Sequence, residues 1–278
     1  MYSQRKQYIG LMKKVIPITF ILFTFGLKAQ EVLHYDNQNV WLNHTLTFEF
    51  SSKYSFHSEV QWRRADWIQQ PQQSLFRFGI NRDFGNGLSA TTGYCYVYTS
   101  QYGKIPVKSA FPENRGWIQL QQKNTRGRIE MIERLRLEQR FVHSPVLNAT
   151  TNLYEAGEAI YSHRARFLQR INIALNKKSF ENGTIYLALW DEFFASFGKT
   201  VPSNIFDQNR AFVGIGMQLP KVGRLELGYL NQLNNKGYSM DPANGKTLNM
   251  REQNNILSIA LYTNIPYEEK KSEDKSEN

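Results

Sequence analysis

This sequence contains few residues of the kinds that make disulfides, metal sites or membrane helices. The single cysteine, Cys95, excludes an internal disulfide and a cysteine-based zinc site. The five histidines are scattered, with no His-Glu-x-x-His pattern. A mean hydropathy of −0.52 excludes a bundle of membrane helices. It does not exclude a membrane β-barrel, because barrel strands show only alternate residues to lipid.

The N-terminal segment has the pattern of a secretory signal peptide. Basic side chains between Arg5 and Lys14 precede a mostly apolar stretch of 13 residues, Val15–Leu27. This stretch is too short to span a bilayer comfortably, which makes a retained membrane anchor the less favoured alternative. We expect Sec-type export with cleavage near Ala29, and no lipoprotein, because no cysteine lies at the cleavage site.

The basic balance of the chain does not indicate nucleic-acid binding. The formal net charge is +10, and residues 1–29 contribute five basic side chains and no acidic ones, which leaves +5. The remaining basic residues recur at alternate positions instead of forming one patch. We therefore expect no nucleic-acid partner.

Apolar and polar residues alternate with a period of two from residue 41 to residue 265, which is typical of β-strands. In the segment 128–141, for example, apolar residues such as Leu135 and Leu137 alternate with Arg134, Arg136 and Glu138. We expect eleven strands, at 40–51, 54–67, 74–83, 88–99, 114–123, 128–142, 160–176, 184–196, 208–219, 222–233 and 253–265.

The lengths of these strands favour a membrane barrel over a soluble sandwich. Several reach 12 residues or more, enough to cross a bilayer at a tilt, and aromatics make up 14% of the chain. The sequence thus predicts an all-β, single-domain, antiparallel transmembrane β-barrel of about 10–12 strands at residues 30–266. A charged, disordered tail is expected at 267–278.

The predicted connections alternate between short turns and long loops, as in bacterial outer-membrane barrels. Short turns are expected at 51–53, 85–87, 124–127, 177–183 and 220–223, and long loops at 100–114, 143–157, 197–207 and 235–250. Eleven strands is an odd number, whereas bacterial single-chain barrels have even numbers. A short extra strand within Gln30–Asn39 would give twelve.

Four groups of residues carry a resemblance to a known family: Trp41…Glu49, Glu59…Arg63, the run Arg-Leu-Arg-Leu-Glu-Gln-Arg at 134–140, and Trp-Asp-Glu-Phe-Phe at 190–194. Over about residues 40–265 the chain resembles domain of unknown function family 2490 (DUF2490), uncharacterised outer-membrane β-barrel proteins common in Bacteroidetes. The resemblance implies a barrel in the bacterial outer membrane and carries no activity.

Charged residues recur on the face that we assign to the lumen, because a charge on the lipid face costs about 2–4 kcal/mol at the midplane. The predicted lumen-lining charges are Glu59, Arg63, Arg77, Glu130, Arg134, Arg136, Glu138, Arg140, Arg164, Arg166, Arg170, Glu192, Arg210, Arg224 and Glu226. They could pair across strands and fill the barrel, or attract anions to a pore. Glu133 is an exception on the apolar face, and a β-bulge could turn it inward.

Strands 128–142 and 160–176 are expected to pair as antiparallel neighbours. Their inner faces then bring six arginines together with few local acids. Because like charges directly opposite each other are destabilising, this wall should recruit acids from across the lumen, such as Glu59, Glu192 and Glu226, or hold anions.

No catalytic, cofactor or metal site stands out in the sequence. An outer-membrane lipid enzyme would need a Ser, His and Asn arrangement, which the scattered histidines do not indicate. The residues of Asp241–Gly245 are more typical of a turn than of a calcium-binding loop. We therefore expect a structural barrel or one that passes small solutes or anions, with membrane lipid and the barrel-insertion machinery as partners. A lipid-acting enzyme, and a binding or assembly role for the long outer loops, remain the alternatives.

Overall fold

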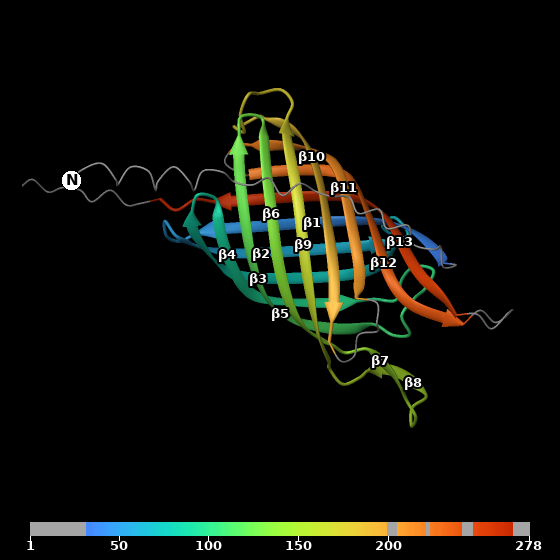
Figure 1. Ribbon diagram of the computed structural model, residues 1–278. Helices are drawn as coiled ribbons and strands as arrows, with labels where there is room; N and C mark the ends of the chain where they lie inside the picture. Colours follow the sequence, from blue (N-terminus) through green and yellow to red (C-terminus); the bar gives the residue numbers. More distant parts are fainter. Residues whose placement is uncertain (1–31, 199–204, 221–222, 241–246, 269–278) are drawn as a thin grey trace, which may run out of the picture. The chain divides into compact units, whose positions relative to one another are not determined.

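The computed structural model describes residues 32–198, 205–220, 223–240 and 247–268, which form a closed β-barrel and one small hairpin (Figure 1). The strands are β1 (Val32–Glu49), β2 (Tyr54–Ala65), β3 (Gln70–Gly85), β4 (Leu88–Thr99), β5 (Phe111–Arg126), β6 (Ile129–Val142), β7 (Pro145–Asn148), β8 (Leu153–Ala156), β9 (Ile160–Ala174), β10 (Ile185–Phe197), β11 (Phe206–Leu219), β12 (Gly223–Met240) and β13 (Thr247–Ile265). The predicted all-β barrel is confirmed. Among the described residues, no helix is long and apolar enough to cross a membrane.

The barrel has eleven strands and closes through one parallel pair. Its order is β1-β13-β12-β11-β10-β9-β6-β5-β4-β3-β2, and every neighbouring pair is antiparallel except β1 with β13. With an odd number of strands, the first and last must run in the same direction. The barrel therefore begins and finishes at opposite ends.

The prediction of a twelfth strand within Gln30–Asn39 is wrong. Residues 32–39 instead form the first part of β1, where Asn39 lies beside Ile256 of β13. The inner side chains of this part are the amides Asn37 and Asn39, and both donate hydrogen bonds to Asn254 Oδ1, at 3.1 and 2.9 Å. Because the outward positions His34, Asp36 and Gln38 are polar as well, the alternation of polar and apolar residues that marks the other strands is missing here.

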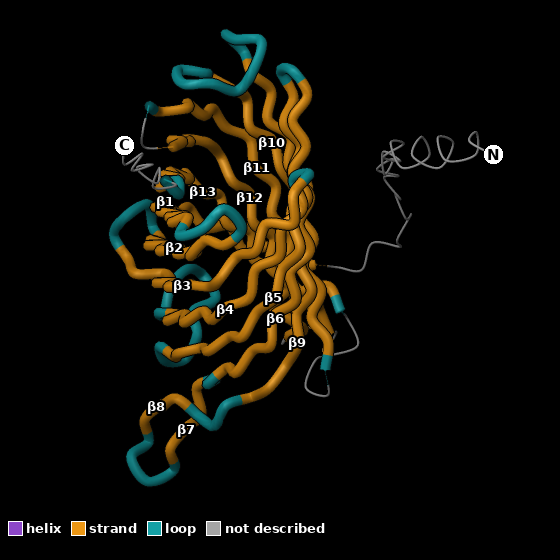
Figure 2. Tube along the Cα trace, turned by 90° about the vertical axis from the view of Figure 1, so that its left-hand side faces the viewer, coloured by secondary structure: helices purple, strands orange, loops and turns teal. Residues whose placement is uncertain are grey.

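The two ends of the barrel differ in their connections. We call the turn end the one with the short β3–β4 and β5–β6 turns, and the loop end the one with the connections after β4, β6, β10 and β12, of which those after β4 and β6 are the longest. One long connection, predicted as a plain loop at 143–157, contains the β7–β8 hairpin, which lies outside the barrel sheet (Figure 2). At its tip, Asn148 Oδ1 accepts hydrogen bonds from the backbone N–H groups of Thr150 and Thr151.

The predicted pairing of 128–142 with 160–176 is confirmed. β6 and β9 are antiparallel neighbours, with Arg136 directly opposite Arg166 and Glu138 opposite Arg164. The register of these two strands therefore brings their inner arginines together, as expected.

Paired glycines mark two places where neighbouring strands approach unusually closely. Gly79 lies opposite Gly93 on β3 and β4, and Gly214 lies opposite Gly228 on β11 and β12. A Cβ atom added at Gly93 would lie 2.0 Å from the carbonyl oxygen of Phe78, where no side chain can fit. Such glycine pairs let a sheet bend sharply enough to close.

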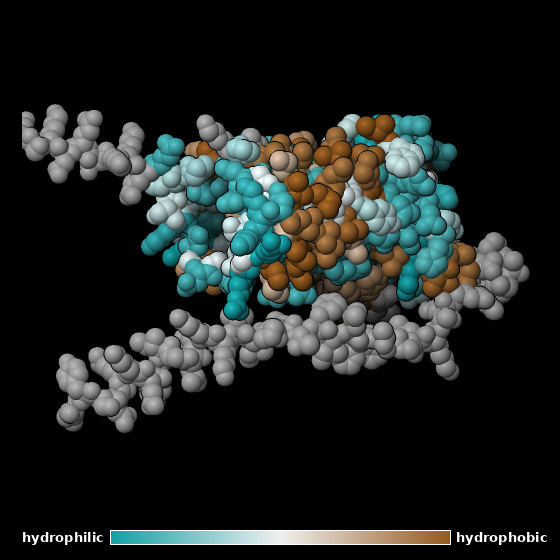
Figure 3. All heavy atoms as spheres, turned by 90° about the horizontal axis from the view of Figure 1, so that it is seen from above, coloured by the Kyte–Doolittle hydropathy of each residue, from teal (hydrophilic) through white to brown (hydrophobic). Residues whose placement is uncertain are grey.

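The outer surface of the barrel carries an apolar area between more hydrophilic ends (Figure 3). On β3, for example, Phe76, Phe78 and Ile80 are 45–51% exposed. Aromatic rings also contact one another on the outside, as Phe50 stacks on Tyr54 near the turn end. An exposed apolar face of this extent is unusual for a protein surrounded by water.

Candidate functional site: the charged interior

The inner face of the barrel gathers the charged side chains. All fifteen residues with a predicted lumen position lie in barrel strands and are buried or partly buried. Among those in ion pairs, the most exposed side chain is that of Arg134, at 20%. Several of them pair between strands that are not neighbours, which places these contacts inside the barrel.

Two glutamates bind the arginines of β6 and β9. Glu192 of β10 accepts hydrogen bonds from Arg134 Nη2 at 2.7 Å and from Arg166 Nη2 at 2.7 and 2.9 Å. Glu138 accepts from Arg166 Nη1 at 2.8 Å and from Arg164 Nε at 2.8 Å. Charge-assisted bonds of this kind are the stronger class of protein hydrogen bonds. Three arginines of this wall, Arg134, Arg164 and Arg166, are therefore neutralised by one local acid and one acid from β10, whereas Arg136 binds the amide oxygen of Gln119.

Further pairs cross the lumen. Glu130 of β6 accepts hydrogen bonds from both Nη atoms of Arg224 on β12, at 2.5 and 2.9 Å, and also pairs with Lys123. Arg170 of β9 pairs with Glu226 of β12, which also accepts from the Tyr186 hydroxyl at 2.7 Å. These links tie the β6–β9 wall to the far side of the barrel.

Of the three acids expected to neutralise that wall, two do so directly. Glu192 and Glu226 bind its arginines, whereas Glu59 pairs with Arg77 of β3. Glu59 thus lies in the same lumen but neutralises an arginine of β3, outside the β6–β9 wall.

The sequence-based set lacked several interior charges, among them Arg115 and Lys236. Glu113 binds Arg115 and Arg140, and Asp207 accepts a hydrogen bond from Arg164 Nη1 at 3.2 Å. Glu252, fully buried on β13, accepts from the Asn234 amide at 2.9 Å. Glu113 and Glu252 lie just before the predicted starts of their strands, so longer strands would have included them.

Asp207 lies inside because of a β-bulge. Phe194 of β10 pairs with Gln208, and the next residue, Ala195, pairs with Phe206, so Asp207 is an extra residue between them. The bulge shifts the alternation by one position and turns the Asp207 carboxylate toward Ser196, whose hydroxyl donates to it at 3.0 Å. Strict alternation in the sequence could not reveal this.

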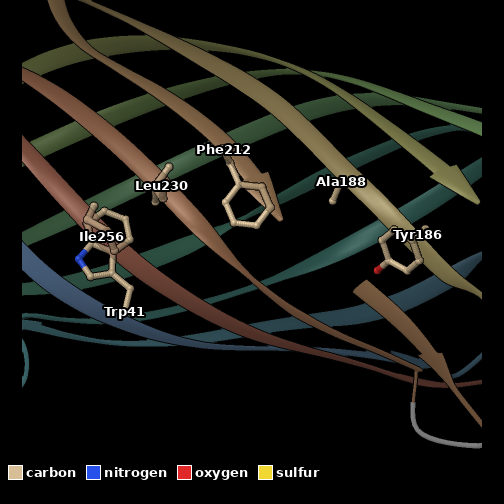
Figure 4. Close-up of a cluster of buried hydrophobic side chains, with 6 residues drawn as sticks. All are labelled: Trp41, Tyr186, Ala188, Phe212, Leu230 and Ile256. Atoms are coloured by element: carbon tan, nitrogen blue, oxygen red, sulfur yellow. The ribbon is translucent and has the colours of Figure 1, made fainter. Parts of the chain in front are cut away.

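Apolar side chains also occupy the lumen. One buried cluster consists of Trp41, Tyr186, Ala188, Phe212, Leu230 and Ile256 (Figure 4). A second consists of Leu75, Cys95, Val97 and Trp117. Arginines lie against these rings, with the Arg136 guanidinium carbon 4.7 Å from the centre of the Trp117 ring. The interior is therefore a packed core of rings and ion pairs over much of its length.

At the loop end the packing leaves a cavity of about 220 Å³, which we call the vestibule. Its lining includes Arg63, Arg77, Arg115, Arg140, Arg166 and Arg210. The connection between β4 and β5 covers part of it, because the Tyr102 hydroxyl donates to Glu252 at 3.2 Å and the Lys104 N–H donates to Asn37. Burial raises the pKa of Tyr102, so this phenol keeps its proton and remains a donor.

The suggested bulge at Glu133 is absent. β6 pairs with β5 and β9 without a register shift, so Glu133 stays on the outer face, opposite Gln122 and Gln169. Asp191 is also on the outer face, where it accepts a hydrogen bond from the Asn209 amide at 3.0 Å, while Glu192 points inward. Two carboxylates, each with amide side chains as neighbours, are thus part of the outer wall.

The described histidines are dispersed over the barrel. His44 bonds Thr263 at 3.0 Å, His163 stacks on Phe197, and His143 bonds the Gly157 carbonyl oxygen at 2.9 Å. Within the described ranges, no three His, Cys, Asp or Glu side chains are grouped to hold a metal ion. The segment Asp241–Gly245, the predicted signal peptide and most of the predicted tail lie outside the described residues.

Comparison with known proteins identifies the family. Residues 38–240 match the model of a family described as protein of unknown function (DUF2490). The chain belongs to this family, and the resemblance found in its sequence motifs is confirmed. No curated protein and no solved structure matches the chain.

Proposed function

We propose that this member of the DUF2490 family is an integral outer-membrane β-barrel with a structural role, and that its own side chains close the lumen. Three features support a membrane location: strands of 12–19 residues, an apolar outer face and aromatic contacts on the outside. The predicted signal peptide gives the route, Sec-type export followed by insertion by the barrel machinery.

We infer a closed lumen from the ion pairs that cross it. Glu130 joins β6 to Arg224 on β12, and its side chain is 1% exposed. The Glu192 side chain, at the centre of the Arg134 and Arg166 pairs, is 2% exposed. A water-filled pore would leave such groups solvated, as in porins.

The first prediction concerns conductance. The refolded mature protein should give almost no steady current in a planar bilayer, because ion pairs and rings fill the lumen. The Glu130→Gln variant, which releases Arg224 and Lys123, should conduct more than the wild type. Large, stable currents through the wild-type protein would contradict a closed barrel.

Passage of anions through the lumen is the alternative to a closed barrel, and the same conductance measurement distinguishes the two. An anion pore requires wild-type currents with anion preference, which Arg166→Glu would weaken because it reverses one lumen charge. Cation-selective currents would contradict both versions.

The second prediction tests the membrane location through Glu133. If this residue faces lipid, Glu133→Leu should raise the free energy of unfolding by about 1–2 kcal/mol, since removing a charge from the lipid face is favourable. Urea unfolding from lipid vesicles measures the change. Glu158→Leu, in an exposed connection at the loop end, is the control and should change little. A loss of stability in Glu133→Leu would argue against lipid at this face.

A binding role for the loop end is a separate candidate, and one observation favours it. The β7–β8 hairpin exposes Val146, Leu147, Leu153 and Tyr154 by 41–63%. Deleting residues 145–156 should abolish co-purification of a partner if the hairpin binds one, and should leave the barrel folded, because these strands pair only with each other.

A further inference from the structure

The vestibule carries more positive charge than its own acids can neutralise. Its lining includes eight basic side chains, seven of them arginines, and only two carboxylates. Those two, Glu113 and Asp207, are already bound by Arg115, Arg140 and Arg164. The other arginines must find counter-charges elsewhere or remain without one.

Arg63 has no carboxylate partner among the described residues. Its side chain is bound only by amides, with Nε donating to Gln61 Oε1 at 2.9 Å and Nη1 to Gln73 Oε1 at 2.6 Å. The residue is nevertheless only 5% exposed. A buried guanidinium without an opposite charge is costly, because the protein interior solvates it poorly.

Arg210 is nearly as poorly neutralised. Its closest carboxylate atom, Glu192 Oε2, is 3.8 Å away, and Glu192 already accepts hydrogen bonds from Arg134 and Arg166. The Arg210 side chain is 12% exposed. One carboxylate thus serves three arginines, which leaves an excess of positive charge.

Both arginines lie over the ring of Trp41. The guanidinium carbons of Arg63 and Arg210 are 3.8 and 5.1 Å from the ring centre. Trp41 is itself fixed, since it is 2% exposed and its Nε1 donates to Gln72 Oε1 at 2.7 Å. This arrangement holds two poorly neutralised guanidiniums on one rigid support at the edge of the same cavity.

We propose that the vestibule binds a small oxyanion, a molecule with a phosphate or carboxylate group, between Arg63 and Arg210. Phosphate and carboxylate oxygens match the planar fork of the guanidinium, which gives two hydrogen bonds per arginine. Neighbouring amides, among them Gln208 and Gln232, can bind the remaining polar atoms of the ligand. Such an anion supplies the counter-charge that the chain lacks at this position.

Calorimetric titration of the refolded full-length mature barrel in zwitterionic detergent tests this inference. Inorganic phosphate and citrate are the two probes, and sodium chloride at matched ionic strength is the blank. At least one probe should bind in a saturable manner and with one site per barrel. Binding of phosphate alone would assign a phosphate group, and binding of citrate alone a carboxylate. The proposal would be overturned if the heats of binding of both probes were no larger than the heat measured with sodium chloride.

Variants locate the site. Arg63→Gln and Arg210→Gln should each weaken binding at least tenfold. Arg64→Gln is the matched control, because Arg64 is adjacent in sequence and lies outside the cavity, where it donates to the carbonyl oxygens of Ile68 and Gln69. An equal loss of binding in Arg64→Gln would contradict the assignment.

Folding and binding can be separated in the same experiment. The shift in gel migration between heated and unheated samples reports barrel formation in each variant. If Arg63→Gln does not fold, Arg63→Lys keeps the charge and removes the fork, and should also weaken binding. The titration needs no channel activity, so its outcome is independent of whether the lumen conducts.

Discussion

Replacing Glu192 with glutamine is expected to lower the free energy of unfolding by about 3–5 kcal/mol, the largest effect that we expect from a single charge removal. The carboxylate is buried and accepts hydrogen bonds from Arg134 and Arg166. Glutamine has nearly the same shape and no charge, so both guanidiniums would remain buried with less compensation. The cost arises from the arginines left behind more than from the bonds that are lost.

Urea unfolding of the barrel in detergent micelles or lipid vesicles measures this change. Glu181→Gln is the matched control, since Glu181 pairs with Lys177 at 3.2 Å and its side chain is 59% exposed. Exposed pairs contribute about 0–1 kcal/mol, so the control should stay near the wild type. Similar losses in the two variants would show that the interior pairs are as well solvated as a surface pair.

The alternation of polar and apolar residues made the charged interior predictable, because one face of each barrel strand points into the interior. It assigned Glu138, Arg164 and Arg166 to the same lumen before any register was known. It could not show which charges would pair. That depends on the relative shift of each strand, which places Arg136 opposite Arg166 and brings Glu192 between Arg134 and Arg166.

Apolar side chains inside the lumen were harder to predict. Trp117 and Phe194 share the inner face with arginines, and alternation treats them as interruptions of a polar pattern. Their place in the core follows from the narrow barrel, where rings fill the space between guanidiniums. The Arg166 guanidinium carbon, for example, lies 4.5 Å from the centre of the Phe194 ring.

Local sequence patterns also could not predict how the barrel closes. The even-number rule for bacterial barrels suggested a twelfth strand, yet the chain closes with eleven through the parallel pair of β1 and β13. Parallel pairing needs partners far apart in sequence, such as Asn37 with Glu252, whose side chains are hydrogen-bonded at 3.2 Å. No turn or spacing near either residue indicates it.

Substituting Gly93 with alanine should destabilise the barrel by about 3 kcal/mol, or prevent it from folding, because the new methyl group meets backbone. Its Cβ would lie 2.0 Å from the Phe78 carbonyl oxygen and 2.7 Å from Gly79 Cα, and neither atom can rotate away as a side chain could. Strands β3 and β4 would have to separate, which breaks the bend that helps to close the barrel.

Gly116→Ala is the matched control for this bend. It adds the same methyl group to β5, where the closest atom, Gln139 Oε1, is 3.9 Å from the new Cβ. This variant should fold like the wild type and change stability by less than about 1 kcal/mol, since alanine also loses less backbone entropy than glycine on folding. The yield of the fast-migrating folded form on unheated gels, followed by urea unfolding, compares the two. If Gly93→Ala folds as well as Gly116→Ala, the close approach of β3 and β4 is not what sets the curvature of the wall, and the paired glycines must have another role.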